Sequence, residues 1–301
     1  MSGRPSAAGI ACGLAAYGIW GFFPLYFHQL AAVPPLDVLT HRALWACLFV
    51  ALLLTLTGGW PKVRSVLATP GQPGRLALAA LLVGSNWLIF LWAVGRQQVI
   101  ESSLGYFLTP LVNVLLGLVV LKERLSRHEG IAVGLAVAAI AHEVFVLGTL
   151  PWVSLALAAT FGTYGLVRKQ VPVEALPGLW LETLVMLPPC LLHVLWQAQQ
   201  GHAVFALGAG STVSAAEQGF LLGAGVVTAV PLLFFAAATR RLDLATVGML
   251  MYINPTLQFL TAVVLFDEPL QPARLFSFGM IWLGLAFFSV GLWQKTRRPR
   301  S

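Results

Sequence analysis

Long apolar stretches separated by short polar connections dominate the pattern of this 301-residue chain. Each stretch holds about 20 residues, enough for a helix to cross the roughly 30 Å hydrocarbon layer of a bilayer. The stretches are continuous and rich in Leu and Ala, whereas membrane β-strands alternate apolar and polar positions. We therefore predict ten transmembrane helices, at about 7–29, 37–57, 75–95, 99–121, 129–147, 150–168, 176–196, 217–238, 244–265 and 274–293.

Composition indicates the same class of protein. Hydrophobic residues make up 58% of the chain and charged residues only 10%, which is too little charge to cover the surface of a soluble domain. The first apolar stretch begins almost directly after the N-terminus and anchors those that follow, so we interpret it as a retained helix rather than a cleaved signal peptide. The predicted fold class is an all-α integral membrane protein.

Basic residues are distributed unequally between the two sides of the predicted membrane. With the N-terminus inside, 15 of the 18 Lys and Arg residues fall on the inner side, Arg96 and Arg274 fall outside, and Arg42 lies within the second span. Positive charge is retained on the cytoplasmic side during insertion. The pattern predicts a multi-pass membrane protein with both termini cytoplasmic. The net charge of +7 then reflects loops that meet membrane lipid, and no nucleic-acid partner is expected.

The chain contains an internal repeat. A shift of 145 residues lays Gly105–Asn113 over Leu250–Gln258, and Pro110 over Pro255. Each half then holds five spans, and an odd number places the second half in the membrane in the opposite orientation. Such inverted repeats usually enclose a substrate site near the midplane. The two predicted repeats are residues 7–147 and 150–293.

Several runs resemble a known family. Tyr17–Tyr26, Glu101–Asn113 and Tyr252–Gln258 are similar to the corresponding runs of RarD-like proteins, which are EamA-type members of the drug/metabolite transporter superfamily. The resemblance covers nearly the whole chain in order. It implies a ten-helix inner-membrane permease built from two EamA repeats. The family commonly has Gln where Met251 stands and Ala where Asn254 stands, so a role for a Gln there does not carry over.

Polar residues fall at helical spacing on one face of the fourth and ninth spans. The repeat pairs Thr109 with Asn254, and Asn113 with Gln258. Our hypothesis is that these four residues face one another across a central cleft and line the solute path. The alternative is ordinary hydrogen bonding between helices. The two stripes consist of Ser102, Tyr106, Thr109 and Asn113, and of Met251, Asn254, Gln258 and Thr261.

Pro110 and Pro255 lie in the middle of those same two spans. Each removes an amide donor and crowds the preceding helical turn, which predicts a kink. The kink either acts as a hinge during transport or is static and only shapes the packing.

Charged residues inside the hydrocarbon are candidates for function because their burial is costly. Arg42 and Glu101 lie near the outer ends of their spans, and we predict a pair between them or an outer gate. The alternative for Arg42 is that its side chain extends to the interface. Glu182 lies deeper, and we predict that it takes up a proton if transport is coupled to proton exchange.

Five aromatic residues lie deep in the predicted spans, away from the interfaces. They either contact the solute or pack between helices, because a ring at helical spacing also fills a core. They are Trp20, Trp87, Tyr106, Tyr164 and Tyr252.

The sequence excludes several chemistries and favours transport. The three cysteines lack metal or redox spacing, no nucleotide-binding motif occurs, and we expect no cofactor and no metal. We predict a transmembrane transporter, acting as a monomer or homodimer in membrane lipid, that moves a small neutral, zwitterionic or amphipathic metabolite or drug on a gradient. The alternative is a membrane-embedded enzyme acting on a lipid-linked substrate. Such enzymes need clustered carboxylates for a divalent ion, and Asp37, Asp243 and Asp267 are isolated.

Overall fold

A computed structural model describes most of the chain. The described residues are 6–120, 122, 126–171, 173–205, 211–239, 241–242, 246–247 and 250–297. Every regular element among them is helical. The helices are α1 (Ala7–Gly21), α2 (Phe23–His28), α3 (Pro35–Thr57), α4 (Trp60–Ala68), α5 (Gln72–Gly95), α6 (Val99–Val120), α7 (Arg127–Leu147), α8 (Trp152–Lys169), α9 (Ala175–Gln199), α10 (Ala215–Thr239), α12 (Ile253–Leu260), the π-helix η1 (Thr261–Leu265) and α13 (Pro272–Arg297).

Eight helices of the described chain are long and apolar enough to cross a membrane, with α1 and α2 counted together as one. They coincide with eight of the ten predicted spans. The predicted sixth span is the helix α8, whose last turn carries Arg168 and Lys169. The ninth is represented by the shorter apolar helix Ile253–Leu265, and much of 243–249 lies outside the described residues. The chain is therefore a multi-pass membrane protein.

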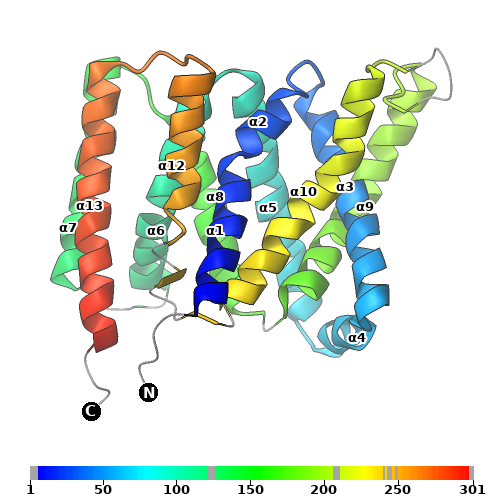
Figure 1. The fold of residues 1–301 in the computed structure, drawn as a ribbon, viewed down its shortest axis with the longest axis horizontal. Helices are drawn as coiled ribbons and strands as arrows, with labels where there is room; N and C mark the ends of the chain where they lie inside the picture. The colour runs from blue at the N-terminus through cyan, green and yellow to red at the C-terminus, as the bar shows by residue number, and fades with distance from the viewer. Residues whose placement is uncertain are drawn as a thin grey trace.

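Two local features depart from a plain series of spans. The first span is interrupted at Phe22, and Pro24 follows in the first turn of α2, where a missing amide is tolerated. The connection after α3 contains the short helix α4, which lies across one end of the bundle (Figure 1). Only Val63 of α4 is buried, so this helix covers the end of the core and does not cross it.

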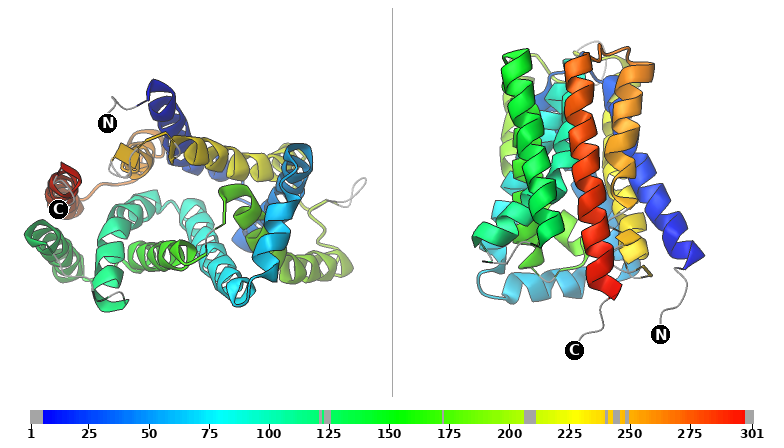
Figure 2. Two further views of the ribbon diagram at one scale, coloured as in Figure 1. Left: turned by 90° about the horizontal axis from the view of Figure 1, so that it is seen from below. Right: turned by 90° about the vertical axis from the view of Figure 1, so that its left-hand side faces the viewer.

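Helices from the two halves of the chain pack against each other. The pairs α3 and α9, α6 and α12, and α7 and α13 are in contact. In addition, α1 contacts α10 and α12, whereas α8 contacts α5 and α6. Figure 2 shows α7 and α13 side by side at one edge of the bundle in both views.

The helix directions define two ends of the bundle. We call the end at which α1 begins the lower end and the opposite one the upper end, as they appear in Figure 1. α13 finishes at the lower end, so both terminal helices have their free ends on the same side. α7 begins at the lower end, whereas α13 begins at the upper end (Figure 2, right). The fourth and ninth spans are therefore followed by connections at opposite ends.

Candidate functional site

Arg42 lies at the centre of the upper half of the bundle. It belongs to the second turn of α3, and its side chain is only 3% exposed. Its Nε donates a hydrogen bond to Oγ1 of Thr228 in α10, at 2.9 Å. The two helices approach closely because Gly225 has no side chain: a methyl group built there would lie 2.4 Å from the backbone carbon of Trp45. Gly225 thereby brings Thr228 within reach of Arg42.

Aromatic rings surround the guanidinium group of Arg42. Its carbon lies 4.0 Å from the centre of the Trp87 ring, 4.9 Å from that of Phe27 and 5.5 Å from that of Phe23. A cation over an aromatic face is attracted by the ring quadrupole, and more strongly when water is excluded. The rings therefore offset part of the cost of burying this charge.

The predicted pair between Arg42 and Glu101 is wrong. Glu101 faces α13 instead, and its carboxylate lies 3.4 Å from Arg274 Nη2. Arg274 also lies 3.5 Å from the carboxylate of Glu143 in α7. Residues 42 and 101 are both near the upper end, but they lie on faces of α3 and α6 that turn toward different neighbours. The position of a residue along a span determines its depth in the membrane. It does not determine which neighbouring helix the side chain contacts.

Asn86 joins three helices next to the Arg42 site. Its Nδ2 donates to the backbone oxygen of Leu157 at 3.1 Å and to Oγ1 of Thr160 at 3.0 Å, both in α8. Its Oδ1 accepts from the hydroxyl of Tyr106 in α6, at 3.2 Å. A buried amide with all of these partners is well satisfied and fixes the positions of its neighbours. It therefore also positions Trp87, the next residue of α5, beneath Arg42.

The polar stripes of the fourth and ninth spans meet through one chain of hydrogen bonds. Ser102 Oγ donates to Oε1 of Gln258 at 3.2 Å, and Gln258 Nε2 donates to Oδ1 of Asn254 at 2.9 Å. Ser102 and Gln258 are buried and link α6 to α12. The bond between Ser102 and Gln258 is an ordinary hydrogen bond between helices, which was the alternative to a solute path for these polar residues.

The other two members of the predicted quartet have different surroundings. Thr109 is buried, and its hydroxyl donates to the backbone oxygen of Gly105 in its own helix, at 3.2 Å. Asn113 is exposed and lies on the α8 side of α6, because a methyl group built on Gly162 would be 3.3 Å from its Oδ1. The arrangement of four residues facing one another therefore does not hold for Asn113.

Helix geometry differs between the two proline positions. Pro110 lies inside the continuous helix α6. Pro255 lies in the first turn of α12, directly after a turn at Met251 and Tyr252 that interrupts the helix. In the first turn the missing amide of proline costs no helical hydrogen bond. A turn therefore precedes Pro255 in the described part of the ninth span, and whether either proline acts as a hinge stays a prediction.

Glu182 forms a buried cluster in the lower half of the bundle. Its side chain is 2% exposed, and its carboxylate lies 3.3 Å from Arg168 Nε. The Tyr164 hydroxyl donates to it at 3.2 Å. Room for the arginine comes from Gly178, where a methyl group would lie 2.5 Å from Arg168 Nη2. The cluster connects α8 to α9 and neutralises the buried carboxylate.

The remaining deep aromatic residues pack between helices. Trp20 and Tyr17 of α1 contact the ring of Phe235 in α10, with ring centres 5.8 and 6.0 Å apart. Tyr164 is stacked on Phe161 at 5.7 Å. Tyr252 is partly buried against the main hydrophobic core. These contacts account for their packing, and a contact with solute stays a prediction.

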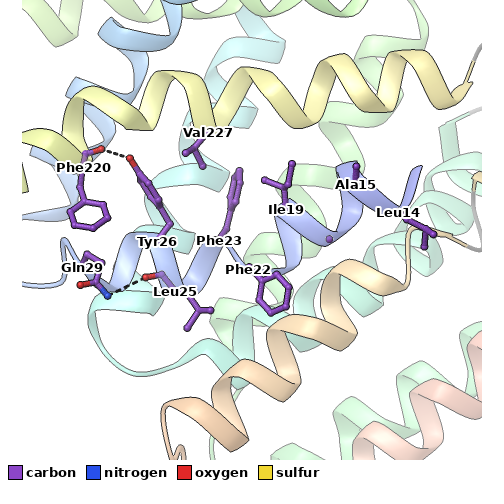
Figure 3. Close-up of a pocket in the computed structure, with 11 residues that line it drawn as sticks. Leu14, Ala15, Ile19, Phe22, Phe23, Leu25, Tyr26, Gln29, Phe220 and Val227 are labelled. Atoms are coloured by element: carbon purple, nitrogen blue, oxygen red, sulfur yellow. Dashed lines mark hydrogen bonds between the residues drawn. The ribbon is translucent and has the colours of Figure 1, made fainter. Parts of the chain in front are cut away.

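An apolar groove of about 710 Å³ adjoins the Arg42 site (Figure 3). Residues of α1, α2 and α10 line it, and the Tyr26 hydroxyl in its wall donates to the backbone oxygen of Phe220. Phe23 lines the groove and also contacts Arg42 with its ring. The groove and the buried guanidinium therefore have Phe23 as a shared neighbour.

Comparisons with known proteins identify the family. A model of the EamA-like transporter family matches residues 7–142. The uncharacterized transporter PA0485 of Pseudomonas aeruginosa is 45% identical over 96% of this chain and 96% of its own. Protein RarD of Salmonella typhi is 42% identical over 96% of both chains. This chain is a RarD-like member of the EamA family. It is accordingly a membrane transporter of the drug/metabolite type.

The fold of this EamA transporter also occurs in a solved crystal structure. That structure aligns with a TM-score of 0.57 over 94% of this chain and 98% of its own, at 20% identity. At this identity the likeness shows the fold alone. The site of the EamA transporter therefore has to be argued from its own residues.

Sequence reasoning missed several residues of this EamA transporter's buried clusters. Arg168 and Arg274 were counted among the loop charges, although both pair with buried carboxylates. Thr228 of α10 and Asn86 of α5 also belong to these clusters, and no prediction from the sequence covered either residue. An amide or hydroxyl in the middle of an apolar span is the signal that would have identified the last two.

Proposed function

We propose that this protein moves a small neutral, zwitterionic or amphipathic solute across the bacterial inner membrane, with both termini cytoplasmic, by alternating access of two inverted repeats. The repeats are residues 7–147 and 150–293. In this scheme one half rocks against the other around a site near the membrane midplane. A gradient drives the movement.

One observation carries the proposal: the most extensive helix contacts keep their pattern when the two halves are exchanged. The exchange replaces α1 by α8, α3 by α9, α5 by α10, α6 by α12, and α7 by α13. Contact of α1 with α10 then becomes contact of α8 with α5, and α1 with α12 becomes α8 with α6, as found. The pairs α3–α9, α6–α12 and α7–α13 map onto themselves. This is the pattern expected of two copies related by a twofold axis.

The interrupted ninth span supports a site at the interface of the halves. Transporters of this kind often bind solute where a helix is broken, because the break exposes backbone groups inside the membrane. Here the turn at Met251 and Tyr252 adjoins the chain of hydrogen bonds from Asn254 to Ser102. Solute movement past this chain would involve both halves.

Transport is tested with purified protein in liposomes. The liposomes are screened with labelled amino acids and amphipathic drugs, with and without an imposed pH gradient. We expect accumulation of at least one solute that empty liposomes do not show. Tags placed at 122–128 and 266–273 should be accessible from opposite faces of the membrane, and access from the same face would contradict the inverted repeats.

Proton coupling would rest on Glu182. A buried carboxylate that alternates between an arginine and a proton can link solute movement to a pH gradient. We expect Glu182→Gln to abolish the response of transport to the imposed gradient. Transport by this variant with its full pH dependence would exclude the coupling role and leave the transport function standing.

A further inference from the structure

Arg42 differs from every other buried charge in the described part of the chain. Five charged side chains are buried there: Asp37, Arg42, Glu143, Glu182 and Glu268. Three of the carboxylates have a basic partner, and Glu268 accepts two backbone amides. Arg42 has the neutral hydroxyl of Thr228 and the faces of aromatic rings. Among these five, only Arg42 has neither a partner of opposite charge nor hydrogen bonds to all of its donors.

One donor nitrogen of the Arg42 guanidinium has no partner. Nε is bonded to Thr228, whereas Nη1 is buried and has no hydrogen-bond partner. A buried donor without a partner carries the whole cost of its lost hydration, and the cost is larger for a charged group. The ring of Trp87 attracts the charge but accepts no bond in the guanidinium plane. The site therefore lacks an anionic acceptor.

We propose that Arg42 binds the carboxylate of a monocarboxylate solute whose apolar body lies in the groove beside it. The planar guanidinium presents parallel N–H groups that match the two oxygens of a carboxylate. One negative charge balances the one positive charge. A phosphate dianion would need a second cation, and the contacts of Arg42 in the described chain are aromatic rings and a hydroxyl. This inference rests on the proposed function and specifies its solute.

The groove provides room for the rest of such a solute. Its wall is formed by apolar side chains such as Ile19, Phe22 and Val227, and its volume of about 710 Å³ is in the range of small-molecule sites. Phe23 lines the groove (Figure 3), and its ring centre lies 5.5 Å from the guanidinium carbon of Arg42. In this inference a carboxylate reaches the guanidinium past Phe23 while an apolar body stays in the groove.

Binding is measured by thermal unfolding of the purified full-length protein in neutral detergent. The probes are benzoate and its neutral counterpart benzamide, which has nearly the same shape. A ligand that binds the folded state raises Tm as its concentration increases. We expect benzoate to raise Tm and benzamide to have no effect at equal concentration. A rise with inorganic phosphate but not with benzoate, or an equal rise with benzamide, would overturn the proposal.

Variants at position 42 assign the effect to the guanidinium. Arg42→Met keeps a long side chain and removes the uncompensated charge, so it should fold and lose the benzoate response. The matched control is Arg96→Met: Arg96 is also an arginine over a tryptophan, 5.8 Å from the Trp92 ring, but it is exposed. This control should keep the response. A benzoate response that survives in Arg42→Met contradicts the inference.

A second substitution covers the case in which the methionine variant does not fold. Arg42→Lys keeps the charge and loses the planar pair of donors, so half-maximal stabilisation should need at least roughly tenfold more benzoate. An unchanged benzoate requirement would overturn the carboxylate geometry. Failure of this inference also differs from failure of the transport function. Liposome transport of some solute that is unaffected by Arg42→Lys would leave transport standing and remove the carboxylate site.

Discussion

Glu268 and Val99 join the two halves of the chain at the upper end of the bundle. The Glu268 carboxylate accepts hydrogen bonds from the backbone amides of Val99 and Ile100, at 2.7 and 2.8 Å. These amides belong to the first turn of α6 and have no partner within the helix. A carboxylate from the second half thus caps a helix of the first half. Its charged form is also attracted by the positive N-terminal end of the helix dipole.

Replacing this cap should destabilise the protein in a pH-dependent manner. Burial raises the pKa of Glu268 above its ordinary value of 4.5, although the two amides act in the opposite direction. The folded state therefore binds a proton more tightly than the unfolded state, so this group's contribution to stability falls as the pH rises through the raised pKa. Glu268→Gln loses one acceptor and should cost about 0.5–2 kcal/mol.

The measurement is Tm of the wild type and Glu268→Gln between pH 4 and pH 8. The other titratable groups are the same in both proteins, so their effects cancel in the difference between the two Tm values. The advantage of the wild type should be largest at the acidic end and decrease toward neutral pH. A difference that grows with pH would mean that the carboxylate is stabilised in its charged form.

Gly225→Ala should push α3 and α10 apart. The added methyl would lie 2.4 Å from the Trp45 carbonyl carbon, and backbone atoms cannot move aside without shifting a helix. Overpacking of this kind costs about 1–3 kcal/mol. Gly219→Ala is the matched control in the same helix, since nothing lies within 4 Å of its new methyl group. Thermal unfolding should show a lower Tm for Gly225→Ala and an unchanged or higher Tm for Gly219→Ala.

Glu182→Gln should be far more destabilising than loss of an exposed ion pair. It leaves Arg168 mostly buried without its partner, and breaking a buried pair from one side typically costs about 3–5 kcal/mol. Glu174→Gln removes the carboxylate from the exposed pair with Lys62, which is worth about 0–1 kcal/mol. Comparable Tm values for the two variants would show that the lower cluster contributes little to stability.

Cysteine labelling separates the accessible members of the polar stripes from the buried ones. In a background without Cys12, Cys47 and Cys190, we expect a cysteine at 113 or 254 to react with a small aqueous thiol reagent. Asn113 is exposed and Asn254 is partly exposed, whereas Thr109 and Gln258 are buried. Cysteines at 109 and 258 should therefore react more slowly. Inertness at all four positions would remove this stripe from the solute path.

Most of the fold follows from local sequence. Eight predicted spans coincide with helices, because an apolar run of about 20 residues has few other ways to satisfy its backbone in lipid. Both terminal helices have their free ends on one side, as the charge pattern predicted. The turn at Met251 and Tyr252 was not predicted: Pro255 indicated a kink in the span, but not that α12 would begin at Ile253.

The sites were predicted unevenly. Arg42, Glu182, Tyr106 and Gln258 were chosen as polar or charged groups in apolar spans, and each lies in a buried cluster. The partner predicted for Arg42 was wrong, and the observed partners Thr228 and Arg168 were not predicted. Arg168 looked like a loop charge because it follows its span closely, yet the room left by Gly178 lets it turn inward.

By itself, the sequence determined eight of the long apolar helices and which polar groups they carry, since the transfer of apolar and charged groups depends on local composition. Only the tertiary structure decided that Glu101 meets Arg274 and that Arg42 meets Trp87 and Thr228. Those pairings depend on the rotation of each helix about its axis and on the small residues, such as Gly225, that let particular helices approach. Both are properties of the packed bundle, because they arise from contacts between segments far apart in the chain.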